Sequence, residues 1–150
     1  MPCVLYVDPD AINRQAFQAA FRQEFKVLLA TDLAGAWTHL EQQDVHVVIC
    51  DQRLPGTSGS LALGQIRSRY PNVRRMLVTA HADMQSIVDA LNQGGACFYI
   101  QEPWEVDVVR EAVHKAFTEI VGEYERTAHT ERLLEANRQL EFALRQTLLM

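Results

Sequence analysis

The chain has 150 residues, 48% of them hydrophobic and 22% charged, with a formal net charge of −5 at pH 7. This length predicts one compact domain rather than two, and so much apolar surface excludes disorder along most of the chain. The negative charge argues against direct contact with nucleic acid, and no apolar stretch is long enough to cross a membrane.

Five short apolar runs of strand length recur along the chain. They are rich in valine, isoleucine, leucine and aromatic residues, and several are almost continuously hydrophobic. Strands that are buried on both faces of a parallel sheet have this composition. In chain order the runs are Val4–Val7, Val27–Ala30, Val45–Cys50, Met76–Thr79 and Cys97–Ile100.

The segments between these runs repeat apolar residues at the spacing of an α-helix. A longer last helix is expected over residues 108–121, and Gly94 and Gly95 are expected to stop the helix before the fifth run. The alternation predicts an α/β fold, (βα)5, in which a doubly wound parallel five-stranded sheet has helices on both faces. The residues expected to cap these helices are Asp10, Thr31 or Asp32, Ser58 and Asp83.

The composition changes after residue 121. Residues 123–150 contain no proline or glycine and show no strand pattern. We therefore divide the chain into a domain of residues 1–121 and a C-terminal helical extension of residues 122–150. The extension ends without a helix-stop signal, so we expect it to link to an output domain that follows residue 150.

Six residues of the extension follow the alternating spacings of three and four that mark a heptad repeat. Leu133 and Leu140 occupy d-type positions and Asn137 an a-type position, a combination that favours two parallel strands. We expect a parallel coiled-coil homodimer; the alternative is an amphipathic helix that folds back on its own domain. The predicted seam consists of Thr130, Leu133, Asn137, Leu140, Leu144 and Thr147.

The cysteines and histidines carry no sign of a metal site. Cys3, Cys50 and Cys97 lie in or beside apolar runs, so we expect reduced, buried thiols in a cytoplasmic protein. The histidines lack the spacing that would place several on one face for zinc, and we expect His81 to lie in an exposed loop.

Polar side chains follow four of the five apolar runs. Asp8 and Asp10 follow the first run, Asp51 the third and Glu102 the fifth, while Thr79 ends the fourth. A single aspartate at such a place is usually a turn or cap residue. Because ligands bind at the carboxyl ends of parallel strands, the combination instead indicates a site where a hard cation, such as Mg²⁺, lies between the carboxylates.

The motifs VLYVDPD, VVICDQRLPGTSG, MLVTAHAD and GGACFYIQEPW, in this order, resemble the receiver domain of bacterial two-component response regulators. The resemblance covers about residues 2–121. It implies the flavodoxin-like receiver fold and a role in signal transduction rather than enzymatic turnover, with at most self-phosphorylation and self-dephosphorylation at Asp51. It also implies a cytoplasmic phosphoprotein that works in a phosphorelay.

By this resemblance Asp51 is the phosphoacceptor, and its donor is a partner histidine kinase or phosphotransfer protein. Asp8, Asp51 and the backbone carbonyl of Arg53 would hold Mg²⁺, with Asp10 as a further candidate ligand. A carboxylate nucleophile that attacks phosphorus is compatible with such a metal, which offsets the negative charge of the two groups.

The resemblance also assigns the residues around the phosphoacceptor. Thr79 would donate its hydroxyl to a phosphoryl oxygen, and Tyr99 would be the aromatic switch that turns inward with it. An ordinary half-buried strand aromatic is the alternative for Tyr99. The peptide bond before Pro103 is expected to be cis. The loop after the phosphoacceptor would be shaped by Pro55, Gly56 and Gly59.

Two positions depart from the family pattern. Pro9 stands where the family has a second acid, and Glu102 stands where it has a lysine. Neither Lys26 nor Lys115 lies at the carboxyl end of a strand, so neither replaces that lysine. The departures leave open a second interpretation, in which the chain is a receiver-like interaction module that works without phosphorylation.

A third interpretation is an enzyme. Asp8-x-Asp10 after an apolar strand resembles the opening motif of haloacid-dehalogenase-type phosphatases, and Thr79 would pass for their second motif. Those enzymes also need a lysine and a further acidic pair at later strand ends, which this sequence lacks. The receiver interpretation therefore accounts for more of the residues.

Overall fold

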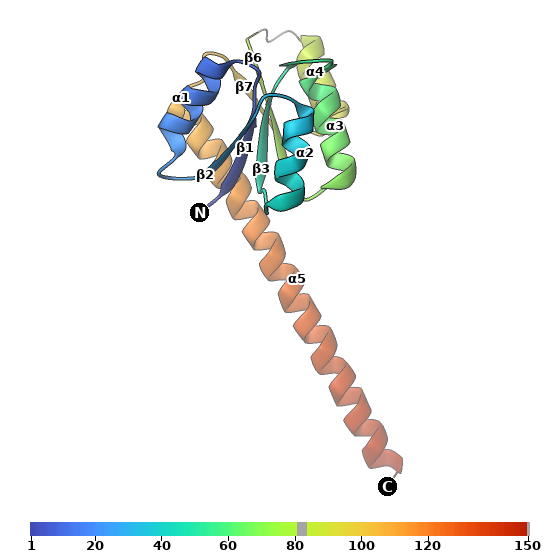
Figure 1. The fold of residues 1–150 in the computed structure, drawn as a ribbon. Helices are drawn as coiled ribbons and strands as arrows, with labels where there is room; N and C mark the ends of the chain where they lie inside the picture. The colour runs from blue at the N-terminus through green and yellow to red at the C-terminus, as the bar shows by residue number, and fades with distance from the viewer. Residues whose placement is uncertain (81–83, 150) are drawn as a thin grey trace. The chain divides into compact units, whose positions relative to one another are not determined.

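The computed structural model describes residues 1–80 and 84–149, and its centre is one five-stranded parallel sheet (Figure 1). The strand order β2-β1-β3-β6-β7 places β1, β3 and β6 in the interior and β2 and β7 at the edges. Each predicted strand is present, with bounds that differ from the apolar runs by one or two residues. The strands are β1 (Cys3–Val7), β2 (Lys26–Ala30), β3 (Val47–Asp51), β6 (Arg74–Thr79) and β7 (Phe98–Gln101).

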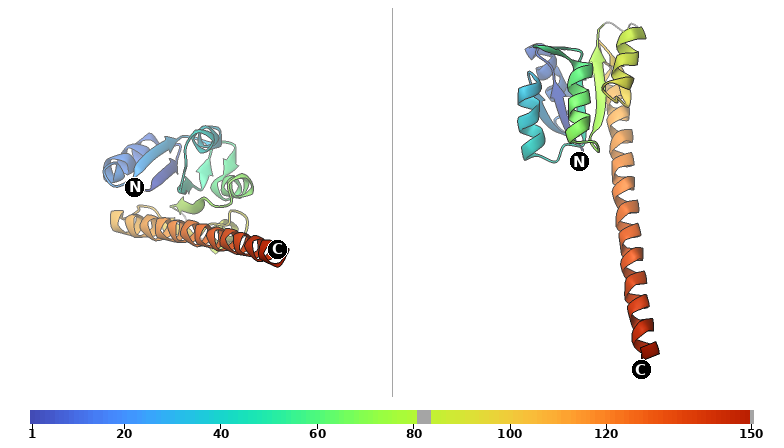
Figure 2. Two further views of the ribbon diagram at one scale, coloured as in Figure 1. Left: turned by 90° about the horizontal axis from the view of Figure 1, so that it is seen from below. Right: turned by 90° about the vertical axis from the view of Figure 1, so that its right-hand side faces the viewer.

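Helices cover both faces of the sheet, as the alternation predicts (Figure 2). One core cluster packs α2, α3 and α4 against residues such as Leu5, Val48 and Leu77. The other packs α1 and the first turns of α5 against residues such as Tyr6 and Ile49. The helices are α1 (Ala11–Phe21), α2 (Leu33–Gln42), α3 (Gly59–Arg69), α4 (Met84–Asn92) and α5 (Val106–Leu149).

Polar caps begin three of these helices. The side chain of Asp10 accepts a hydrogen bond from Ile12 N, that of Asp32 from Gly35 N and that of Ser58 from Leu61 N. Asp32 rather than Thr31 is therefore the cap of α2. The predicted cap Asp83 and the predicted loop residue His81 lie outside the described residues.

A small hairpin that the sequence did not predict follows β3. It pairs β4 (Arg53–Leu54) with β5 (Thr57–Ser58) in antiparallel fashion. The turn between them is Pro55-Gly56, and Gly56 has a φ of 75°, which suits the third position of a type II turn. Strands of two residues are too short to show an alternating pattern, so neither strand could be recognised from the sequence.

Cys97 corrects the expectation that all the cysteines are buried. Cys3 and Cys50 are buried, whereas Cys97 is exposed. It directly precedes β7, an edge strand that pairs with β6. The neighbouring Phe98 is also 38% exposed, because an edge strand is not covered as completely as an interior one.

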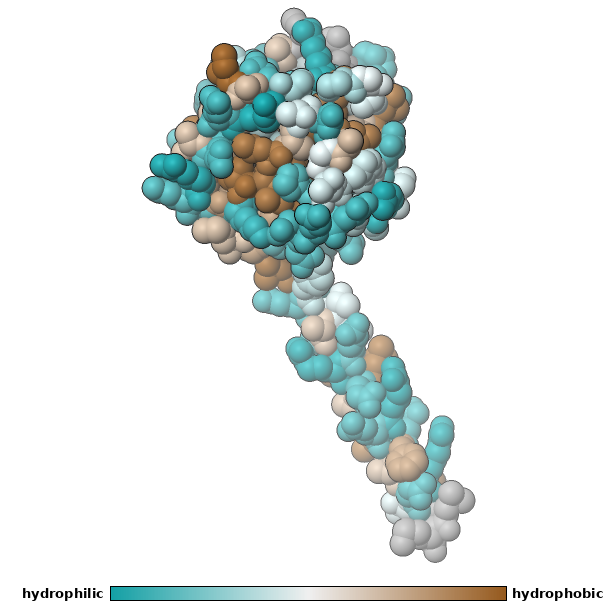
Figure 3. All heavy atoms as spheres, in the orientation of Figure 1, coloured by the Kyte–Doolittle hydropathy of each residue, from teal (hydrophilic) through white to brown (hydrophobic). Residues whose placement is uncertain are grey.

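The chain separates into two compact units, Met1–Phe117 and Thr118–Met150, and α5 contributes to both. In the second unit, the described residues form only helix, mostly hydrophilic on the face drawn in Figure 3, with isolated apolar residues. None of the helices in the described part of the chain combines the length and apolarity that a membrane span requires.

Candidate functional site

Three carboxylates meet at the carboxyl edge of the sheet. Asp8 follows β1, Asp51 ends β3 and Glu102 follows β7. One oxygen from each lies within 4.8 Å of the others. The parallel register produces this meeting, since Val7 pairs with Cys50 and Thr79 with Gln101, which brings the residues after them to one edge. The strand ends thus converge as the sequence predicts.

Asp8 is fully buried and its carboxylate is held by several donors. Oδ2 accepts hydrogen bonds from the Tyr6 hydroxyl at 2.8 Å and from Asn13 Nδ2 at 3.1 Å. Oδ1 accepts one from Asp10 N at 2.8 Å. Burial and the neighbouring Asp8 charge raise the pKa of Tyr6, so its hydroxyl keeps the proton that it donates. These bonds fix the orientation of the Asp8 carboxylate.

Asp51 is partly exposed, and a long hydrogen bond reaches its carboxylate. Arg53 N donates to its Oδ1 at 3.3 Å. Burial raises the pKa of Asp51 to about 6; the charges of Asp8 and Glu102 add to this, and the Arg53 bond opposes it. The Asp51 carboxylate therefore holds its charge with little compensation, as expected of a group that reacts or binds a cation.

The loop after Asp51 is held by Gln52. Gly59 N donates to the Gln52 carbonyl at 2.8 Å, and the Ser60 hydroxyl donates to Gln52 Oε1 at 3.0 Å. An added Cβ at Gly59 would collide with the backbone of Asp51 and Gln52. Glycine at this position therefore allows the loop to pass close behind Asp51.

Glu102 reaches the site from the end of β7, whereas Asp8 reaches it from β1, on the other side of β3 in the sheet. Its backbone N–H donates to the Thr79 carbonyl at 2.9 Å, and its peptide bond to Pro103 is cis. Within the described residues, its Oε1 is buried and has no hydrogen-bond partner. Burial raises the pKa of Glu102, as do the charges of Asp8 and Asp10, while Arg53 lowers it.

The other residues singled out from the sequence take different places. Thr79 is buried at the end of β6, and Tyr99 is half-buried within β7. Asp10 is exposed, caps α1, and is not in the carboxylate cluster found among the described residues. Arg53 and Pro9 are exposed at the rim.

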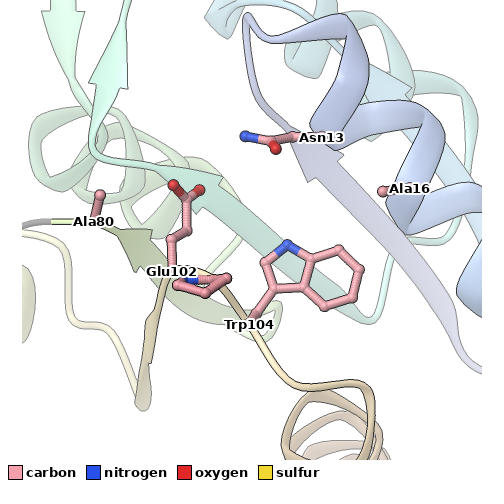
Figure 4. A pocket seen from close by; sticks show the side chains of 6 residues that line it. Asn13, Ala16, Ala80, Glu102 and Trp104 are labelled. Atoms are coloured by element: carbon pink, nitrogen blue, oxygen red, sulfur yellow. The ribbon is translucent and has the colours of Figure 1, made fainter.

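Sequence reasoning missed the residues that surround Glu102 and Asp8. A hollow of about 510 Å³ beside the carboxylates is lined by residues that include Asn13, Ala16 and Trp104. In Figure 4, Glu102 and Asn13 extend toward one another across this hollow, with the indole of Trp104 beside them. Asn13 lies one helical turn after Asp10, the spacing that could have marked it as facing the same edge.

The donor set suits a hard divalent cation. Carboxylate oxygens are the ligands that Mg²⁺ and Ca²⁺ prefer, and the buried Oε1 of Glu102 lacks any other partner among the described residues. Asp8 and Asp51 would hold such an ion together with a backbone carbonyl of the following loop. The ion would supply positive charge where the carboxylates otherwise repel each other.

Comparison with known proteins gives a consistent result. The sequence model of the response regulator receiver domain matches residues 4–114. The hydrogenase transcriptional regulatory protein HoxA of Bradyrhizobium diazoefficiens is 33% identical over 113 residues, which make up 75% of this chain and 23% of that protein. The chain thus spans about a quarter of the length of the curated relatives it matches.

Solved structures share the fold. The signal receiver domain of an HD domain-containing protein from Pseudomonas fluorescens Pf-5 superposes with a TM-score of 0.77 at 27% identity, covering 81% of this chain and 98% of that one. The response regulator protein TrrA from Thermotoga maritima, in complex with Mg²⁺-BeF, gives 0.69 at 23% identity, covering 77% and 99%. Because TrrA is only 23% identical to this chain, its likeness shows the fold alone.

Proposed function

The chain belongs to the response regulator receiver domain family, and we propose that it accepts a phosphoryl group on Asp51 from a partner histidine kinase or phosphotransfer protein. The observation that carries this proposal is the placement of Asp51 at the end of β3, beside the buried Asp8 and ahead of a loop held by Gln52. The likeness to response regulators does not favour the interpretation without phosphorylation.

The proposed step is a transfer between two protein groups. An oxygen of Asp51 attacks the phosphorus of a phosphohistidine, the new O–P bond forms as the P–N bond breaks, and the histidine nitrogen takes up a proton. Mg²⁺, held by Asp8, Asp51 and the Arg53 carbonyl, would offset the charge that accumulates on the phosphoryl oxygens. Thr79, buried at the neighbouring strand end, is the residue that would donate its hydroxyl to one of them.

Phosphorylation is tested by the reaction of Asp51 itself. Incubation with Mg²⁺ and acetyl phosphate should add one phosphoryl mass, and Asp51→Asn should abolish the addition. Asp44→Asn is the matched control, since Asp44 is an exposed acid outside the carboxylate cluster, and it should react like the wild type. If the wild-type protein does not react at millimolar phosphodonor, the proposal fails. The interpretation as an interaction module that works without phosphorylation then takes its place.

We further propose that the change at Asp51 passes through Tyr99 and α5 to a covalently linked output domain in a cytoplasmic protein. Tyr99 lies in β7, the strand that precedes α5 in the chain. The HoxA proteins that the chain matches are about three times its length, and they are transcriptional regulatory proteins. An output segment after α5 accords with both observations.

The C-terminal part of α5 is proposed to form a parallel coiled-coil dimer. The leucines of the predicted seam are exposed in the single chain, Leu133 by 53%, Leu140 by 61% and Leu144 by 56%. Pairing would remove this apolar surface from water. A dimer would set two receivers side by side, so that a change at Asp51 could alter how the paired helices lead onward.

Sedimentation equilibrium tests the dimer. The wild type should sediment as a dimer at tens of micromolar, and Leu140→Glu should make it a monomer. Phe142→Glu is the control, because Phe142 is 64% exposed but lies two residues after the d-type Leu140, on the side of the helix that would face away from a partner helix. Equal sedimentation of the wild type and Leu140→Glu would contradict the coiled coil.

A further inference from the structure

We infer that Glu102 is itself a ligand of the divalent cation, so that Asp8, Asp51 and Glu102 form a three-carboxylate site that binds the cation without a phosphoryl group. The inference deepens the proposed function, on which it rests for the roles of Asp8 and Asp51. It assigns to Glu102 a task different from that of the lysine expected at this position.

The separation of the carboxylates fits one shared ion. Oxygens bound to one Ca²⁺ at about 2.3–2.6 Å lie up to about 5 Å apart. Those of Asp8, Asp51 and Glu102 lie within 4.8 Å of one another. A smaller Mg²⁺ needs oxygens at most about 4.2 Å apart, so it would draw the three carboxylates closer together than Ca²⁺ would.

The second observation concerns the Glu102 carboxylate itself, which is not fully paired within the described part of the chain. Its Oε1 is buried without a hydrogen-bond partner among the described residues, and a buried polar group without a partner is unfavourable. Asp8, at the same edge, has its oxygens matched by Tyr6, Asn13 and a backbone N–H. A cation between the three carboxylates would give the Glu102 oxygen the partner that it lacks.

The arrangement has opposite effects on the cation and on the phosphoryl group. A third carboxylate adds attraction for a bare cation, whereas it repels the phosphoryl oxygens that a lysine would attract. Glu102 should therefore strengthen cation binding and weaken the phosphorylated state. Replacing Glu102 by lysine should weaken cation binding and strengthen the phosphorylated state, so the two measurements should change in opposite directions.

Cation affinity is measured on the full chain by calorimetric titration with Mg²⁺ and, separately, with Ca²⁺. Glu102→Gln should weaken binding by about tenfold and Glu102→Lys by about a hundredfold, because each removes attraction that acts over a few ångströms. Glu105→Gln is the matched control, since Glu105 is exposed three residues further on, and its affinity should stay within twofold of the wild type.

A second readout comes from Trp104, which lies beside Glu102 in the hollow. In a Trp37→Phe background its fluorescence should change on cation titration, and the midpoint should shift with Glu102→Gln as in calorimetry. The same spectra, followed in urea, show whether each variant is folded. Folded Glu102→Gln protein with wild-type affinity for both ions would overturn the inference.

Beryllofluoride separates this inference from the proposed function. With Mg²⁺ held at a concentration that saturates each variant, Glu102→Lys should strengthen the beryllofluoride response by about tenfold or more, and an unchanged response would contradict the placement of Glu102 opposite the phosphoryl group. If Asp51 takes up no phosphoryl group but Glu102→Gln still weakens cation binding, the proposed function fails and the cation site stands. If Asp51 reacts and Glu102→Gln leaves cation affinity unchanged, the cation role fails alone.

Discussion

Two carboxylates at the same edge of the sheet, Asp8 and Glu102, are held in opposite ways. The Asp8 carboxylate accepts hydrogen bonds from a tyrosine hydroxyl, an asparagine amide and a backbone N–H. The Glu102 carboxylate has a buried oxygen without a partner in the described part of the chain. The hydrogen bonds of the Asp8 carboxylate are supplied by the protein itself, whereas the Glu102 oxygen gains a partner only when a further group binds.

The origin of the difference lies in the strands that carry the two residues. Asp8 follows β1, which is paired on both sides and packed between helices on each face. Glu102 follows β7, an edge strand, where fewer neighbours are available to supply donors. The interior of the sheet therefore provides a fixed frame for Asp8 and Asp51, and the edge provides a carboxylate that depends on its ligand.

The largest expected effect comes from breaking the frame behind Asp51. In Gly59→Ala the new Cβ would press on the Asp51 carbonyl and lie 2.9 Å from Gln52 Cα. Backbone atoms cannot yield as a flexible side chain would, so we expect a loss of about 3 kcal/mol in the free energy of unfolding, measured in urea. Gly122→Ala, where the nearest atom is the flexible Arg126 guanidinium at 3.2 Å, should be neutral or stabilising; equal losses would refute this account.

The next effect tests the hydrogen bonds of Asp8. Tyr6→Phe removes the hydroxyl that donates to Asp8 Oδ2 and leaves the aromatic ring, which stacks on Phe17, in place. Losing a buried hydrogen bond to a charged group should lower the unfolding free energy by about 2 kcal/mol. Tyr70→Phe serves as the control, because Tyr70 packs with Trp37 in the other core cluster. A loss no larger than that of the control would show that Asp8 does not depend on Tyr6.

Much of the fixed side of the site could be predicted from the sequence. The apolar runs gave the strand order along the chain, and the rule that parallel strands end at one edge placed Asp8, Asp51 and Glu102 together. The caps Asp10 and Ser58 could be identified because capping is local, made by a side chain and a backbone N–H two or three residues away.

What escaped the sequence depends on contacts between distant residues. The burial of Glu102 Oε1 follows from the surroundings of the segment after β7, where Trp104 packs on Phe17 with ring centroids 5.8 Å apart. No periodicity reports such a contact. The exposure of Cys97 depends in the same way on β7 being an edge strand, and the edge position is a property of the whole sheet rather than of the run itself.

A smaller effect measures the charge that Asp51 holds in the frame. Its pKa of about 6 lies above the ordinary 3.8, so the folded protein binds the proton more tightly than the unfolded chain, and stability falls as pH rises from about 4 to 6. Two pKa units equal nearly 3 kcal/mol, which screening at this partly exposed group reduces to about 1 kcal/mol. Asp51→Asn should therefore stabilise the protein by about 1 kcal/mol at pH 8 in EDTA. The gain should shrink toward pH 5; a gain independent of pH would exclude the charge as its cause.

The smallest expected effect, and the one that bears most directly on the comparison, is that of Glu102→Gln on stability. Without a cation, ionised Glu102 is disfavoured by burial and by the charges of Asp8 and Asp10, so the variant should be more stable at pH 8, by less than about 1 kcal/mol because the group is partly exposed. With several millimolar Mg²⁺ the order should invert, because binding stabilises the protein in proportion to affinity and the wild type binds more tightly. Urea denaturation in EDTA and in Mg²⁺, with Glu105→Gln beside it, measures both. If Glu102→Gln is more stable than the wild type both in EDTA and in Mg²⁺, Glu102 depends on a cation no more than Asp8 does.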